Sequence, residues 1–282
     1  MKHELLFTKT SGAGNDFVII DNRDGILPPD KAALARRLCS RHFGVGGDGL
    51  LLLERSSRAH FTMKYYNSDG SYGGMCGNGG RCIAQYAFIN GIAPREMVFE
   101  ALDFVYHAEI LPNLVSLRMK DPTDIKTELQ VHVGKELHHA FFVNTGSPHV
   151  VVFVNNVASV DVDRLGKAIR NDAAFLPEGT NVNFVEISGN DRIRLRTYER
   201  GVESETLACG TGSVAAAVIS HLFRKLALPI TIHVRSGETL KVDATSNGET
   251  LTSPKLEGSA HILFTGRMLY DDGEHMISDI AS

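Results

Sequence analysis

The chain has 282 residues, a formal net charge of −4, 43% hydrophobic residues and 22% charged residues. These values are typical of a globular protein with one large or two medium domains, and the absence of a Lys/Arg-rich block argues against nucleic acid or an anionic membrane as a partner. No apolar run approaches the roughly 18 residues that cross a bilayer, and the first residues lack the apolar core of a signal peptide. We therefore expect a cytoplasmic protein without a membrane partner.

The predicted elements alternate short strands with few helices, separated by glycine-rich or proline-containing turns. In the first half, strands are expected at 5–8, 17–21, 50–53, 61–66, 97–101, 104–111 and 114–119, and helices at 28–39 and 82–89. In the second half, strands are expected at 140–144, 149–154, 182–187, 192–199 and near residues 230, 240, 250 and 262, and helices at 162–170 and 213–225. Numerous hairpin-scale connections favour antiparallel or mixed sheets over a regular parallel series.

The chain carries the same plan twice. Cys76 and Cys209 each stand in a Cys-Gly-x-Gly motif that follows a predicted strand and opens a predicted helix, with Tyr65 and Tyr198 each 11 residues upstream of the cysteine. A gapless offset of 133 residues also pairs Asn67 with Arg200 and Ser71 with Ser204. We therefore expect an α+β fold of two pseudo-symmetric domains, with residues 1–120 and 259–282 around Cys76 and residues 121–258 around Cys209.

A cysteine at a helix N-terminus lies at the positive end of the helix dipole, which favours the thiolate. The flanking glycines let a ligand approach the backbone closely, and the N–H groups of the first turn form a site suited to a carboxylate. Two such motifs on two domains can place a thiolate on one face of a carbon and a thiol on the other. This arrangement suits inversion at the α-carbon of an amino acid, because one sulfur removes the proton and the other returns one.

Other interpretations of the cysteines and glycine-rich segments stay open. Free cysteines are often inert packing residues, which is how we interpret Cys39 and Cys82. The four cysteines contain no C-x-x-C pair, which argues against structural zinc and against a thioredoxin-like redox protein, and we expect no metal and no cofactor. The segment from Gly12 to Asn15 precedes a strand, so it lacks the context of a dinucleotide fingerprint, and the Cys76 segment lacks the ending of a phosphate-binding loop.

Several motifs resemble those of the diaminopimelate epimerase family over nearly the whole chain. They are Gly12-Ala13-Gly14-Asn15-Asp16-Phe17-Val18, Arg41-His42-Phe43-Gly44-Val45-Gly46-Gly47-Asp48-Gly49, Tyr66-Asn67-Ser68-Asp69-Gly70-Ser71, Cys76 to Cys82, Pro148-His149, Tyr198-Glu199-Arg200-Gly201 and Cys209-Gly210-Thr211-Gly212. The cysteine motifs also fit proline racemases, which typically carry histidine at the position of Asn78. Asn78 and Glu199-Arg200 therefore favour the epimerase.

The resemblance implies a cofactor-independent isomerase that interconverts LL- and meso-diaminopimelate on the route to lysine and peptidoglycan. It also implies a homodimer, a small-molecule amino-acid substrate, two domains that each wrap a sheet around a central helix, and an active site in the cleft between them. Cys76 and Cys209 would be the acid/base pair. The resemblance implies that the reacting carboxylate is held by Gly77, Asn78, Gly210 and Thr211. It implies that the distal end of the substrate is held by Asn15, Asn67, Asn181 and Arg200. It also implies that the reacting centre is oriented, or its protonation tuned, by Glu199 and His149.

The chain departs from the family pattern at three places. Ser147 stands where asparagine often precedes Pro-His, Gly49 stands where some members carry glutamine, and the segment from Arg200 to Cys209 is one residue longer, which affects the placement of Glu203 and Glu205. Asn67 could instead be a turn residue and His149 a structural histidine. Among whole-protein alternatives, a proline or hydroxyproline racemase and a non-catalytic anion-binding protein remain.

Overall fold

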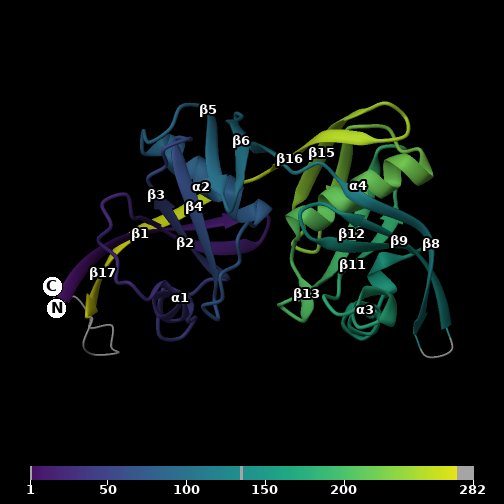
Figure 1. Ribbon diagram of the computed structural model, residues 1–282, viewed down its shortest axis with the longest axis horizontal. Coiled ribbons are helices and arrows are strands. Elements are labelled where there is room, and N and C mark those ends of the chain that lie inside the picture. The colour runs from purple at the N-terminus through teal and green to yellow at the C-terminus, as the bar shows by residue number, and fades with distance from the viewer. Residues whose placement is uncertain (1, 134–135, 272–282) are drawn as a thin grey trace. The chain divides into compact units, whose positions relative to one another are not determined.

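The computed structural model describes residues 2–133 and 136–271. These residues form two compact units; in Figure 1 the first is purple to blue with its last strand, β17, in yellow, and the second runs from teal to yellow-green. The first unit contains the described residues up to Leu117 and from Ser259 onward, and the second unit is Arg118–Gly258. The last strand of the chain therefore returns to the first unit.

The first unit is a mixed sheet of eight strands, in which only two neighbouring pairs are parallel. In sheet order the strands are β17 (His261–Asp271), β1 (Lys2–Gly12), β2 (Asn15–Asp21), β3 (Gly49–Glu54), β4 (Phe61–Asn67), β5 (Glu96–Ala101), β6 (Phe104–Ile110) and β7 (Val115–Arg118). The parallel pairs are β2–β3 and β4–β5. A parallel pair needs a crossover connection, and helices α1 (Lys31–Cys39) and α2 (Gly77–Ile89) supply the two crossovers.

The second unit repeats this order of strands and directions. Its strands are β8 (Thr123–Val133), β9 (Glu136–Asn144), β10 (Pro148–Phe153), β11 (Asn181–Ile187), β12 (Arg192–Glu199), β14 (Ile230–His233), β15 (Thr239–Ser246) and β16 (Leu251–Gly258). Again only two pairs are parallel, β10–β11 and β12–β14, and helices α3 (Val162–Arg170) and α4 (Gly210–Arg224) make the crossovers. A short strand, β13 (Ser204–Thr206), pairs with β12. Short 3₁₀ turns lie at Val157–Ser159 and Ala173–Phe175.

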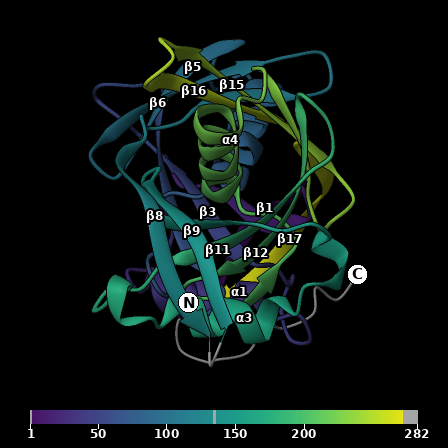
Figure 2. The same cartoon turned by 90° about the vertical axis from the view of Figure 1, so that its right-hand side faces the viewer.

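The helices α2 and α4 lie at the centres of their units. Helix α2 contacts β1, β2, β3, β4, β6 and β17, and α4 contacts seven strands of the second unit; Figure 2 shows α4 with strands above and below it. Consecutive positions Val214–Ile219 are all buried, as expected for a helix enclosed on every side. Small residues such as Ala215–Ala217 let the strands approach the helix closely. The predicted α+β fold with a sheet around a central helix is confirmed.

The structure adds one strand to the predicted set and extends another. Strand β8 was not predicted, because its first residues, Thr123–Gln130, are mostly polar and follow Asp121-Pro122, which resembled a linker. Strand β8 pairs with β9 as an antiparallel partner, so its polar side chains can face solvent. The sequence left the role of the residues after Arg267 open; as far as Asp271 they belong to β17, which pairs with β1 as far as Lys2. Residues 272–282 lie outside the described residues.

The internal repeat is real, but its gapless alignment was wrong. Leu51 of β3 packs against Gly79 in the first turn of α2 and lies opposite Tyr65, and Asn183 of β11 packs against the equivalent Gly212 of α4 and lies opposite Thr197. Tyr65 therefore corresponds to Thr197 rather than to Tyr198, an offset of 132. The connection from β12 to α4 is one residue longer than that from β4 to α2, which restores the offset of 133 at the cysteines.

Candidate active site

Cys76 is the N-cap residue of α2. Its backbone is extended (φ −124°, ψ 124°), and its Sγ accepts a hydrogen bond from the N–H of Gly79 at 3.5 Å. The first N–H groups of a helix have no intrahelical acceptor, so the N–H groups of Gly77 and Asn78 belong to the positive end of α2. The sulfur is partly accessible. This half of the predicted site thus combines a helix-capping sulfur with backbone donors.

Asn78 connects this helix start to the β1–β2 hairpin. Its amide Nδ2 donates to Asn15 Oδ1, and its Oδ1 accepts from Arg81 Nη2 at 2.9 Å. Asn15 Nδ2 in turn donates to Asp48 Oδ2 at 3.0 Å. Arg81 is fully buried. Both ends of the Asn78 side chain are therefore occupied by protein partners.

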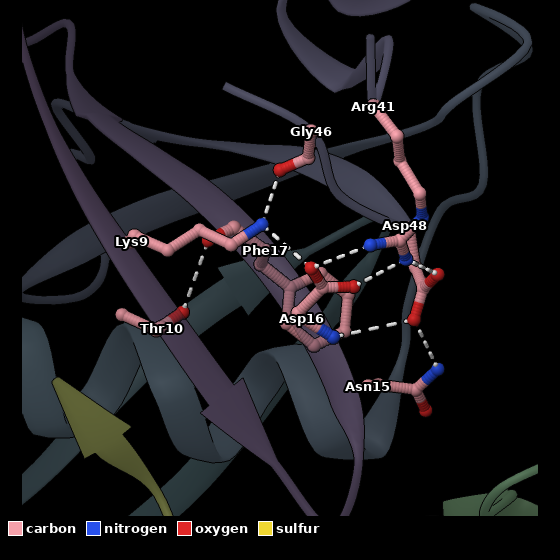
Figure 3. Close-up of polar contacts among 8 residues, drawn as sticks. All are labelled: Lys9, Thr10, Asn15, Asp16, Phe17, Arg41, Gly46 and Asp48. Atoms are coloured by element: carbon pink, nitrogen blue, oxygen red, sulfur yellow. Dashed lines mark hydrogen bonds and ion pairs between the residues drawn. The ribbon is translucent and has the colours of Figure 1, made fainter. Parts of the chain in front are cut away.

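A charged cluster of Lys9, Asp16, Arg41 and Asp48 supports Asn15, as Figure 3 shows. Lys9 Nζ contacts Asp16 Oδ2 at 2.6 Å, and Arg41 Nη2 reaches both Asp16 Oδ1 and Asp48 Oδ1 at 2.8 Å. Burial raises the pKa of Asp16, but the hydrogen bonds and positive charges of Arg41 and Lys9 outweigh it, so the net pKa lies below the ordinary value. The sequence motifs contained Asp16, Arg41 and Asp48 but not Lys9, and the mutual contacts of these residues were not predicted.

Asn67 ends β4 and makes its hydrogen bonds locally. Its Oδ1 accepts from the Tyr65 hydroxyl at 2.7 Å, and its Nδ2 donates to Ser71 Oγ at 2.9 Å. This is the pattern of a turn residue, so a substrate would have to displace one of these contacts. Gly49 lies opposite Asn67 in β3, and an added Cβ would overlap the Tyr65 ring and lie 2.6 Å from the Tyr66 carbonyl oxygen. The glycine at this position is therefore a packing requirement.

Cys209 is the N-cap residue of α4, in the position equivalent to Cys76. It is buried, and its side chain does not accept the N-cap hydrogen bond that the Cys76 side chain accepts. The Cys209 Sγ lies 3.5 Å from the hydroxyl of Thr211, which lies 2.9 Å from His149 Nε2. The two sulfurs thus share a helix position, one beside a backbone N–H and the other beside a hydroxyl.

His149 lies in β10, close to the start of α4. It is fully buried, with Ser147 Oγ and Thr211 Oγ1 each 2.9 Å from Nε2. Burial, with a smaller contribution from the positive charge of Arg200, lowers the pKa of His149 to about 3. The imidazole is therefore neutral at physiological pH, and Ser147 contacts it directly in place of the longer asparagine of the family pattern.

Asn181, Glu199 and Arg200 lie together where β11 begins and β12 ends. Asn181 Nδ2 donates to the Pro148 carbonyl and its Oδ1 accepts from the backbone N–H of Arg200, both at 2.9 Å. The Arg200 guanidinium donates to the Glu178 carbonyl oxygen at 3.1 Å. The backbone contact fixes the start of the loop that follows β12, and the Arg200 side chain extends from there.

The longer loop between Arg200 and Cys209 places its two glutamates in ion pairs. Glu203 contacts Arg170 at 2.8 Å, and Glu205 contacts Arg196 at 2.6 Å. Both carboxylates therefore stabilise the loop within the second unit. Neither was a predicted site residue.

The burial of His149 predicts a pH dependence of folding stability. Its pKa is about 3 in the folded chain and about 6.5 in the unfolded chain. Below pH 6.5 the unfolded chain binds a proton that the folded chain does not, so folding stability is highest above pH 6.5 and falls as the pH is lowered toward 3. Between pH 6.5 and 5 the loss from this group is about 2 kcal/mol. We expect urea titrations of His149→Gln to show a smaller drop in unfolding free energy over this range than the wild-type chain, whatever its stability at pH 7. Equal pH slopes in the two proteins would contradict the neutral buried imidazole.

Comparison with known proteins identifies the family. The family model described as diaminopimelate epimerase matches residues 7–103 and 141–261. The chain is 45% identical to the diaminopimelate epimerase of Chlorobaculum tepidum over 260 residues, covering 91% of this chain and 98% of that protein. It is 42% identical to the diaminopimelate epimerase of Aquifex aeolicus, covering 93% and 97%.

The chain belongs to the diaminopimelate epimerase family. Solved structures with the same fold include a phenazine biosynthesis protein of Bacillus anthracis (TM-score 0.73, 16% identity, covering 94% of this chain and 99% of that one). Another is a hydroxyproline epimerase from Agrobacterium vitis (TM-score 0.71, 15% identity, covering 96% and 94%). Among the described residues of this family member, no helix is long and apolar enough to cross a membrane, and no His, Cys, Asp and Glu side chains cluster as a metal site.

Proposed function

We propose that this chain interconverts LL- and meso-diaminopimelate, with Cys76 and Cys209 as the two acid/base groups. The observation that carries the proposal is that each cysteine caps the equivalent central helix of a duplicated unit, in a chain of the diaminopimelate epimerase family. A duplicated unit supplies two similar acid/base groups. Inversion at one carbon needs two such groups, because one removes the proton from one face and the other donates a proton to the opposite face. The activity would place the chain in lysine and peptidoglycan precursor synthesis.

In the proposed reaction, the thiolate of one cysteine removes the α-proton and the thiol of the other donates a proton to the opposite face. The α-hydrogen of an amino acid is a very weak acid, so the carboxylate must be stabilised as it gains enolate character. The backbone N–H groups of Gly77 and Asn78 on α2, and of Gly210 and Thr211 on α4, would supply this stabilisation at the two helix N-termini. No electron sink from a cofactor enters this scheme.

The distal amino-acid end of the substrate would bind Asn15, Asn67, Asn181 and Arg200. A guanidinium can hold a carboxylate through two parallel hydrogen bonds, which makes Arg200 the expected partner of the distal carboxylate. Glu199 lies next to Arg200 and would orient the ammonium group of the reacting centre. His149 is neutral, so it would act through hydrogen bonds rather than as a cation.

We also propose that the chain acts as a homodimer in the cytoplasm. Leu6 on β1 is 62% exposed although this strand pairs with β17 on one side and β2 on the other. A large exposed apolar side chain is suited to an interface, and a second copy of the chain would cover it.

A substrate panel tests the proposed activity. We expect the purified chain, after treatment with a chelator and without added pyridoxal phosphate, to convert LL-diaminopimelate to the meso form, as followed by separation of the stereoisomers. L-proline and trans-4-hydroxy-L-proline should not react. Preferential turnover of either imino acid would assign the chain a racemase activity instead, and loss of activity on chelation would contradict the cofactor-independent mechanism.

A further inference from the structure

Asn183 is a fully buried amide in the middle of the apolar strand β11, close to the start of α4. An added Cβ at Gly212, in the first turn of α4, would overlap Asn183 Oδ1, so the amide packs directly against this turn. Buried polar side chains are normally kept for their hydrogen bonds. The hydrogen bonds of Asn183 therefore indicate what it does.

The orientation of the Asn183 amide is fixed by its neighbours. Its Nδ2 lies 2.9 Å from the Val150 carbonyl oxygen and 3.1 Å from His149 Nδ1, and its Oδ1 lies 3.1 Å from the Thr197 hydroxyl. A carbonyl oxygen can only accept, so the amide nitrogen must face Val150. The second N–H of the same nitrogen then points at His149 Nδ1.

This contact decides which nitrogen of His149 carries the proton. Because Asn183 donates to Nδ1, Nδ1 has to accept, and the neutral ring carries its hydrogen on Nε2. Nε2 therefore donates to the hydroxyls of Ser147 and Thr211, each 2.9 Å away. The Thr211 oxygen also accepts from the Ser147 hydroxyl at 3.4 Å. The hydrogen of the Thr211 hydroxyl is then available to Cys209 Sγ at 3.5 Å.

We propose that Asn183 is a positioning residue, which holds His149 in its Nε2–H form so that the Thr211 hydroxyl donates a hydrogen bond to the sulfur of Cys209. The inference rests on the proposed function of Cys209 as an acid/base group. A donor aimed at the sulfur stabilises the thiolate, which is the form that removes a proton.

The first unit is built differently at the equivalent place. At the position of Asn183 it carries Leu51, which packs against Gly79 in the first turn of α2. The sulfur of Cys76 accepts from the backbone N–H of Gly79 instead. A leucine thus fits this place in the fold, so the amide of Asn183 is not required for packing against a helix start.

The test is the substitution Asn183→Leu, which gives the second unit the residue of the first. We expect kcat to fall about 10- to 100-fold, the range of one hydrogen bond to a charged group, with KM changed less than about threefold. Thr211→Val should give a similar loss, and the double variant should lose no more than either single variant, because both changes interrupt the same path. Additive losses would overturn the proposal.

The matched control is Thr197→Val, which removes the other hydrogen bond of the same buried amide but leaves its contacts to Val150 and His149. We expect this variant to lose stability while keeping kcat within about threefold of wild type. A loss of kcat equal to that of Asn183→Leu would mean that any disturbance of this buried cluster affects the rate, and would contradict the specific role.

A spectroscopic measurement separates this inference from the proposed function. Long-range ¹H–¹⁵N correlation spectra report which histidine nitrogen carries the proton, and the His149 signals are those absent from His149→Gln. We expect the Nε2–H form in the wild-type chain and in Thr197→Val, and a mixture of forms in Asn183→Leu. An Nδ1–H form in the wild-type chain would overturn the proposal even if the epimerase activity is found. The spectra report the form of His149 without an activity assay, so they test the role of Asn183 even if no activity is found.

Discussion

Alanine in place of either Cys76 or Cys209 is expected to lower the epimerisation rate about 10⁴-fold, the upper range for one general acid or base. Each variant retains one sulfur, so it can still exchange a proton on one face of the α-carbon but cannot deliver one to the other. Binding should change little, because the proposed carboxylate donors are backbone N–H groups that alanine preserves. The measurement is the rate of meso-diaminopimelate formation from the LL isomer at saturating substrate.

Cys39→Ala is the matched control for these variants. Cys39 is the last residue of α1 and is buried in the apolar core, and burial raises the pKa of its thiol to about 12, so it is an inert thiol. We expect this variant to retain the wild-type rate. Full activity of Cys209→Ala, or loss of activity in Cys39→Ala, would contradict the assignment of the acid/base pair.

Asp16→Ala is expected to destabilise the chain by about 3 kcal/mol, because it removes one partner of a buried ion pair. The Lys9 side chain is only 7% exposed, and without Asp16 it keeps the Gly46 carbonyl oxygen as a contact. The pKa of Asp16 is lower in the folded chain than in the unfolded chain. The contribution of Asp16 to folding stability is therefore present at pH values above its ordinary pKa, and it is lost as the pH falls through the pKa of the folded chain. Urea denaturation at pH 7 measures the effect.

Asp24→Ala provides the comparison for a solvent-exposed pair. Asp24 contacts Arg55 at 2.9 Å, but their side chains are 79% and 73% exposed, and such pairs contribute less than about 1 kcal/mol. We expect the change in unfolding free energy to be several times smaller than for Asp16→Ala. Similar values for the two variants would show that the Lys9–Asp16–Arg41 cluster does not support the β1–β2 hairpin as inferred.

The sequence predicted the elements that carry strong local signals. Helix α3 begins and ends at the predicted residues, Val162 and Arg170, with Asp161 accepting from the Arg164 N–H as its N-cap. The central helices were predicted to open at the cysteine motifs, and both cysteines are N-cap residues. Capping residues and glycines act within a few residues of sequence, so their effects can be recognised without the fold.

Features that depend on distant contacts were missed. The polar strand β8 is stabilised by pairing with β9, and nothing in its own pattern signalled a strand. The alignment of the two repeats shifts by one residue, and only the strand pairing reveals this shift: Tyr65 of the first repeat is equivalent to Thr197 of the second. Asn183 is a polar residue in an apolar strand and was not a predicted site residue, because its importance depends on His149 and Thr211, which are remote in sequence.

The central claim is that two sulfurs act on opposite faces of one carbon, and proton exchange in the single-cysteine variants tests it most directly. Cys76→Ala and Cys209→Ala would each be incubated in D₂O with the LL isomer and, separately, with the meso isomer, and deuterium at the α-carbons would be measured by mass spectrometry. The account predicts that one variant exchanges only the LL isomer and the other only the meso isomer, both without inversion. Exchange of both isomers by the same variant would contradict it.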